Sequence, residues 1–330
     1  WWQEDLDENI PPELFILKTH TYGVVSSGRV LELCLEKLAQ ANKTNSPFFR
    51  LFTKTVYVDD AFSNCRSELH AEKLKGGCEK ILPKYGFKAK GYAQSHIPPP
   101  EEISEDHDGE KSVGALGMIW IPETDILKIK APIFNFQGKK HRGKSSGTPF
   151  AGSSFKELDD YVPKELTLRM VASQAASIWD PVGFSGPWNL GVKHILRMSL
   201  NSIASKGNDK WEMPLNSTLR DLWVFKFWEM IEMSKISFPR CTFPLGINYT
   251  ELIVLAMSDM GKIGKLQSFY SLKKISHDNY HVQLIYSKNQ LGDKRTVPCQ
   301  ELDSMNNASI VLDRICTSLE KVDRRAILVD

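Results

Sequence analysis

Apolar residues recur along this 330-residue chain at two spacings, one typical of helices and one typical of strands. Helical spacing predicts helices over 30–41, 68–82, 164–179, 187–204, 211–236 and 298–319. Shorter apolar runs predict strands at 14–17, 56–60, 87–92, 116–120, 125–129, 252–257, 267–271, 281–287 and 325–329. Because the two kinds of element do not alternate strictly, the pattern predicts an α+β fold class.

The stretch with the clearest candidate chemistry is 52–63, FTKTVYVDDAFS, in which an apolar run leads into Asp59 and Asp60. Adjacent residues of a strand point to opposite faces, so both carboxylates can serve one site only at a tight turn. Carboxylate oxygens suit Mg²⁺, and two-metal nucleotidyl transfer uses such a site. The alternative is a solvated acidic turn, because turns select aspartate for local hydrogen bonds.

A second pattern, THTYGVVSSG at 19–28, lies upstream of Tyr57-Val58-Asp59-Asp60. Together the two patterns resemble the reverse transcriptase/RNase H part of a BEL/Pao-type LTR retrotransposon polyprotein. The resemblance implies that Asp59 and Asp60 bind Mg²⁺ (or Mn²⁺) and the nucleotide triphosphate in the later half of a polymerase palm. It also implies residues that contact template and nucleotide, namely Tyr57, Gly23, Ser26 and Ser27.

Two further segments resemble parts of the same family. The hairpin that begins at 116–120, LGMIW, is similar to a primer-gripping element, and an ordinary hairpin with a buried Trp120 explains it equally well. The segment SQAASIWDPVGFSGPW at 173–188 and the later FPRC at 238–241 resemble the helical thumb. Each aromatic residue between 163 and 245 also fits simple core packing.

The last 80 residues are predicted to form three antiparallel strands, a helix and a further strand, which is the order of an RNase H fold. The resemblance implies a carboxylate set of Asp259, Glu301 and Asp330 that holds two Mg²⁺ ions across the scissile phosphate of an RNA/DNA hybrid. Relatives usually read Asp-Ala-Ser where this chain has Asp259-Met260-Gly261. Each acid alone is also typical of a cap or a helix-dipole partner.

The sequence therefore predicts four regions: a C-terminal part of a reverse transcriptase palm, a basic loop, a helical thumb or connection, and a truncated RNase H-like domain. Their boundaries are 1–135, 136–162, 163–245 and 246–330. The expected partners are an RNA template, an RNA/DNA hybrid and deoxynucleotide triphosphates. A further palm aspartate is expected upstream of residue 1, so the alternative function is an inert, truncated retroelement descendant that binds nucleic acid or has a structural role.

Two other functions are excluded by local sequence. Residues 138–145 satisfy G-x-x-x-x-G-K-[ST], but Gly147, Pro149 and Gly152 forbid the helix that a phosphate-binding loop must open. We therefore interpret 137–148 as a basic loop that could touch phosphates only through charge. An aspartic peptidase needs Asp-[Ser/Thr]-Gly, which the sequence lacks.

Bulk composition adds the cellular setting. A net charge of +2 argues neither for nor against nucleic acid, so any basic surface must be local. Six cysteines without C-x-x-C spacing predict neither a zinc site nor a disulfide framework. With no membrane-spanning run and no signal peptide, the expected location is cytoplasmic, in a virus-like particle, with no membrane partner. The oligomeric state is not predicted by the sequence.

Overall fold

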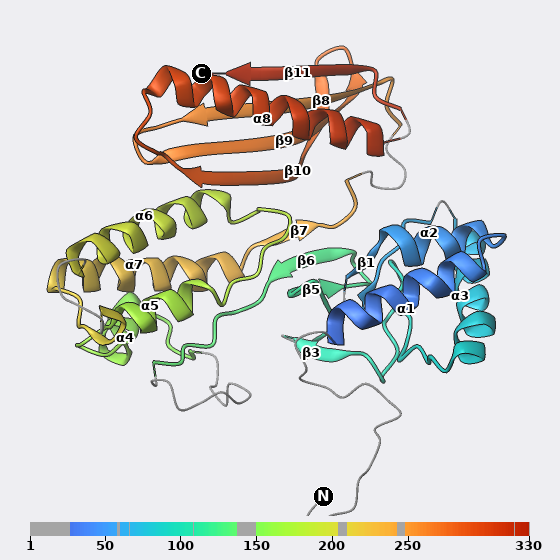
Figure 1. The fold of residues 1–330 in the computed structure, drawn as a ribbon, viewed down its shortest axis with the longest axis horizontal. Helices are drawn as coiled ribbons and strands as arrows, with labels where there is room; N and C mark the ends of the chain where they lie inside the picture. Colours follow the sequence, from blue (N-terminus) through green and yellow to red (C-terminus); the bar gives the residue numbers. More distant parts are fainter. Residues whose placement is uncertain are drawn as a thin grey trace, which may run out of the picture. The chain divides into compact units, whose positions relative to one another are not determined.

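A computed structural model describes residues 27–57, 60–65, 67–107, 109–136, 150–203, 210–242, 248–319 and 321–329. The chain divides into two compact units, Trp1–Lys90 and Gly91–Asp330. Both units contain helices and strands, as the mixed class predicted from the sequence requires (Figure 1). No helix in the described part of the chain is long and apolar enough to cross a membrane.

The first unit contains three helices and a small hairpin. Its elements are α1 (Ser27–Ala41), α2 (Ser46–Lys54), β1 (Val56–Tyr57), β2 (Asp60–Ala61), α3 (Glu68–Ile81) and the 3-10 turn η1 (Leu82–Tyr85). No helix was predicted between 41 and 68, where the structure has α2. Asn45 caps that helix by accepting a hydrogen bond from the backbone N–H of Phe48 at 3.4 Å. The strand predicted at 87–92 is absent, and these residues form no regular structure.

The second unit opens with a five-stranded antiparallel sheet in sequential order. Its strands are β3 (Glu105–His107), β4 (Glu110–Ala115), β5 (Met118–Ile121), β6 (Ile126–Ile129) and β7 (Ser237–Pro239). No strand was predicted over 97–112, which holds β3 and the start of β4. The prolines at 98–100 form no regular structure, and the charged strand β3 is an edge strand of the sheet.

A buried carboxylate fastens β7 to the β5–β6 hairpin. Asp125, with 6 % of its surface exposed, accepts hydrogen bonds from Arg240 Nε at 2.6 Å and Nη2 at 3.0 Å. Trp120 Nε1 donates to the same carboxylate at 3.1 Å, and the guanidinium lies 5.4 Å from the centre of the indole ring. The contact explains why FPRC and the Trp hairpin belong together in the fold.

A helical subdomain lies between β6 and β7 in the sequence. It contains α4 (Phe155–Tyr161), α5 (Leu168–Ala175), α6 (Gly186–Ile203), the 3-10 turn η2 (Lys210–Glu212) and α7 (Ser217–Ser234). Trp223 and Phe227 are fully buried in its core, and Trp188 is nearly so. Core packing is therefore the role of these aromatic residues. The helix predicted over 164–179 is shorter, because Thr167 caps α5 and the helix ends at Ala175.

The chain ends in a four-stranded sheet covered by one helix (Figure 1). Its elements are β8 (Glu251–Met260), β9 (Gly264–Ser276), β10 (Asn279–Leu291), α8 (Val297–Ser318) and β11 (Arg324–Val329). The strand order is β10-β9-β8-β11, with the first three strands antiparallel and β11 parallel to β8. This confirms the order of elements predicted for the last 80 residues.

The helical subdomain docks on β10 through the turn that precedes α6. The backbone N–H of Ser287 donates to the carbonyl of Val182 at 2.8 Å. The side chain of Asp180 organises the turn by accepting hydrogen bonds from the N–H of Gly183 at 2.8 Å and of Ser185 at 2.6 Å. The Asp-Pro-x-Gly segment is thus the element that joins the helices to the last sheet.

Candidate functional site

The hairpin at 56–61 places the first group of predicted site residues. Tyr57 pairs with Asp60 across β1 and β2, so the chain reverses between them, as the predicted acidic turn requires. Asp60 is exposed and the Tyr57 side chain is half-exposed. Ser27 is the first residue of α1. The predicted residues Asp59, Gly23 and Ser26 lie outside the described residues, as does Asp330.

The first strand of the last sheet has two faces with different chemistry. Val254 and Ala256 of β8 pack against Ala308 and other residues of α8, so the even-numbered positions face the helix. Ser258 continues this face, and its hydroxyl lies 2.6 Å from the hydroxyl of Ser304. Asp259 follows on the opposite face, because successive residues of a strand alternate, and its side chain is exposed.

The neighbouring strands set the ends of the site. Asp259 pairs with Leu266 of β9, which shares its face of the sheet. On the other side of β8, the described ladder ends at the pair Val329 and Ser258. Glu301 lies near the start of α8 and is half-buried. Its neighbours on the helix, Gln300 and Ser304, are buried. The predicted acids Asp259 and Glu301 therefore come from elements that pack together, but Asp259 points away from α8.

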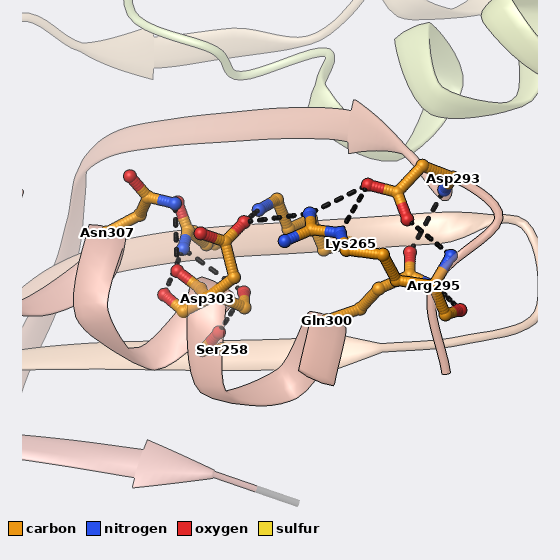
Figure 2. Close-up of polar contacts among 9 residues, drawn as sticks. Ser258, Lys265, Asp293, Arg295, Gln300, Asp303 and Asn307 are labelled. Carbon is orange, nitrogen blue, oxygen red and sulfur yellow. Dashed lines mark hydrogen bonds and ion pairs between the residues drawn. The ribbon is translucent and has the colours of Figure 1, made fainter. Parts of the chain in front are cut away.

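A lysine occupies the helix-facing side of β9 at the same end of the sheet. The Lys265 side chain is only 8 % exposed, and its Nζ lies 2.8 Å from Asp303 Oδ2 of α8 (Figure 2). This hydrogen bond, followed by the positive charge of Lys265, holds the pKa of Asp303 below its usual range. Asn307 donates to the Asp303 carbonyl at 2.8 Å. The cation is therefore matched by a carboxylate from the covering helix.

A second ion pair closes the loop that leads into α8 (Figure 2). Asp293 accepts hydrogen bonds from the backbone N–H and the Nε of Arg295, both at 2.8 Å, and these lower the pKa of Asp293. Gln300 holds the loop from the helix, accepting from the Asp293 N–H at 3.0 Å and donating to the Arg295 carbonyl at 2.7 Å. Arg295 also reaches Asp303 at 3.4 Å, so the two pairs form one network.

These contacts decide how well the end of the sheet suits a pair of divalent cations. Two-metal hydrolysis needs several carboxylates that converge on both ions. At this end, Asp303 is neutralised by Lys265, Ser258 faces the helix, and Asp259 lies on the other face. Within the described ranges, no three His, Cys, Asp or Glu side chains are grouped to hold a metal ion. The described acids at this end of the sheet therefore do not converge on one point, and Asp330 of the predicted set lies outside the described residues.

A small polar cavity lies between β9, β10 and α8. Its volume is about 10 Å³, which holds at most a water molecule. The lining residues are Lys265, Gln267, Lys288, Asn289, Gln290 and Asn307. Gln267 Nε2 donates to the carbonyl of Ser304 at 2.5 Å.

Sequence reasoning missed the residues that form this network. Lys265 and Asp303 are 38 positions apart, so no local pattern links them. A signal for Ser258 did exist, because Leu252, Val254 and Ala256 form an alternating apolar series whose next member is Ser258. Extending that series one step beyond the predicted strand would have placed the aspartate on the other face.

A family model described as Pao retrotransposon-like RNaseH-like domain matches residues 167–330. The match begins at Thr167, the N-cap of α5, and runs to the end of the chain. It therefore covers α5 to α7 as well as the last sheet and α8, which agrees with the docking of the helices on β10. No curated protein matches the chain.

Proposed function

The chain belongs, through residues 167–330, to the Pao retrotransposon-like RNaseH-like domain family, and we propose that this region binds RNA/DNA hybrid in a retrotransposon polyprotein without two-metal cleavage. The strand order β10-β9-β8-β11 with α8 on one face supports the RNase H-like part of the proposal. Domains of this kind act on nucleic acid, so hybrid duplex is the partner with the strongest support.

One observation supports the part of the proposal that excludes two-metal cleavage. The helix-facing end of the sheet, where α8 begins, contains Ser258, Ser304 and the Lys265–Asp303 ion pair. An ammonium group at this position repels a divalent cation and already satisfies the acid beside it. We therefore favour the alternative of an inert retroelement descendant that binds nucleic acid.

The test compares binding and cleavage in one preparation of the full chain. A labelled RNA/DNA hybrid is titrated in Mg²⁺ and in EDTA at the same ionic strength, and the RNA strand is followed on a denaturing gel. Equal affinity in the two buffers and intact RNA are expected. Mg²⁺-dependent cleavage that Glu301→Gln abolishes would overturn the proposal and favour the carboxylate set Asp259, Glu301 and Asp330. A chain that binds no hybrid would also contradict it.

A second candidate function, RNA-directed DNA polymerisation, is favoured by the hairpin alone. Pairing of Tyr57 with Asp60 produces the chain reversal that a metal-binding turn needs. In this proposal Asp59 and Asp60 would hold Mg²⁺ or Mn²⁺, which would supply charge stabilisation for the triphosphate. Primer extension by the polyprotein region that contains this chain should be lost in Asp60→Asn. Undiminished extension by that variant would exclude the hairpin from the polymerase site.

A further inference from the structure

Two cations on α6 reach across to the end of β10. Lys193 Nζ lies 2.7 Å from Asn289 Oδ1 and 3.3 Å from its backbone oxygen, and Arg197 Nη1 lies 2.7 Å from the carbonyl of Gly292. Lys193 and Arg197 are one helical turn apart, which sets their side chains about 5–6 Å apart at their bases. Both residues are exposed to solvent.

The hydrogen-bond partners of Lys193 and Arg197 described above are neutral oxygens. These contacts therefore hold the two cationic groups in place without neutralising their charge. Lys288, also exposed, precedes Asn289 in β10 and adds a third positive charge. Partial burial lowers the pKa of Lys193, and the nearby positive charge of Lys288 lowers it further. Without a bound anion, this repulsion is unfavourable for the folded state.

The strand geometry spreads the three charges around one edge of the sheet. β10 is the outer strand, next to β9 only. Lys288 pairs with Gln267, which faces α8, whereas Asn289 pairs with Leu266 on the face where α6 docks. Lys288 therefore lies on the α8 face of this edge, and Lys193 and Arg197 lie on the face where α6 docks.

We propose that Lys193, Arg197 and Lys288 form a phosphate-binding surface along the β10 edge, which holds the sugar-phosphate backbone of the nucleic acid. The inference rests on the proposed function and names the surface that performs it. Cations spaced by a helical turn contact successive phosphates of one strand and release condensed counterions, which makes binding steeply dependent on salt. The surface joins the helical subdomain to the last sheet, so a bound duplex contacts both.

The test measures hybrid binding by fluorescence anisotropy over a series of KCl concentrations. The variant K193Q/R197Q/K288Q is compared with the wild type and with K156Q/K164Q/K321Q, which removes the same charge from exposed lysines elsewhere in the chain. Each lost phosphate contact lowers the slope of log K against log salt by about 0.9, so the first variant should lower it by roughly 3. Its affinity at low salt should fall at least about tenfold. The control should keep the wild-type slope.

A single substitution distinguishes the loss of a phosphate contact from the loss of docking between α6 and β10. Lys193 and Arg197 also hold α6 on β10, so K288Q alone is measured, with an expected slope change of about 1. A lysine on an edge strand also opposes pairing between sheets of neighbouring molecules. The variant K288E keeps a charge on the edge, so it still opposes such pairing, but its carboxylate repels phosphate. Weaker hybrid binding by monomeric K288E supports the proposal. Wild-type slopes in K288Q and in the triple variant would overturn it, whereas no binding by the wild type would instead contradict the proposed function.

Discussion

The backbone oxygen of Ser287 lies so close to Gly183 that a β-carbon at position 183 would overlap it. Gly183 also has a φ of +85°, a conformation that other residues adopt only with strain. The contact lies where the helical subdomain meets β10. Docking of the two parts therefore depends on a residue without a side chain.

Gly183→Ala should detach or strongly destabilise this junction. Steric overlap with backbone and an unfavourable φ together should lower the free energy of unfolding by roughly 3 kcal/mol or more. Urea unfolding followed by far-UV circular dichroism measures the change. Gly114→Ala is the matched control, since a β-carbon there meets no atom within 4 Å. Equal stability of the two variants would contradict the role given to Gly183.

Arg240→Ala should destabilise the five-stranded sheet, because it leaves the buried Asp125 carboxylate without its charged partner. Breaking a buried pair on one side costs roughly 3 kcal/mol, although the partly exposed arginine makes this an upper value. Trp120 keeps one hydrogen bond to Asp125, and urea unfolding followed by circular dichroism measures the loss of stability. Adding Asp125→Asn to Arg240→Ala should restore part of the loss. A double variant less stable than the single one would contradict the account.

The Lys265–Asp303 pair predicts acid sensitivity of the last sheet. The pKa of Asp303 is lower in the folded chain than its ordinary value of about 4. Its stabilising contribution is therefore complete above about pH 4 and is lost as the pH falls through the folded pKa. Asp303→Asn should reduce stability at pH 7 and flatten its decline below pH 4, as measured by urea midpoints. Asp278→Asn, on an exposed turn, should retain the wild-type profile.

Cysteine reactivity should report on the first unit. Burial, with a smaller effect of Glu79, raises the pKa of Cys78 to about 11, so little thiolate exists at pH 8. Cys34 and Cys299 are exposed. Iodoacetamide at pH 8, followed by mass spectrometry, should label these two first and Cys78 only when the unit opens. Labelling of Cys78 at the same rate as Cys34 would show that its burial is not maintained in solution.

The order of the last strands and helix was predictable because long alternating runs separated by a polar turn leave little choice of topology. Their lengths were not. β9 extends from Gly264 to Ser276, whereas the pattern predicted only 267–271. Lys265 and Lys273 look like breaks in an apolar run, yet both are buried, one against Asp303 and one beside the carbonyl of Thr242. Only tertiary partners explain buried lysines.

Elsewhere, the structure differs from the sequence pattern at single residues. No helix was predicted over α2, although Pro47 lies in its first turn, where proline is compatible with a helix. The face of β8 on which Asp259 lies was not predicted, and a shift of one residue in a strand reverses its face. The chain reversal between Tyr57 and Asp60 agrees with the tight turn expected for the two aspartates. The partners of Lys193 and Lys265 were not, because each lies in a distant segment.

The closure of the five-stranded sheet by β7 has a consequence for synthesis on the ribosome. The 107 residues between Ile129 and Ser237 emerge while the edge of β6 stays unpaired. At about 5–20 residues per second, this takes roughly 5–20 s. An open edge can recruit strands of neighbouring nascent chains, and Lys128 places a charge on it. Translation speed across α4 to α7 therefore sets how long the nascent chain is exposed to mispairing.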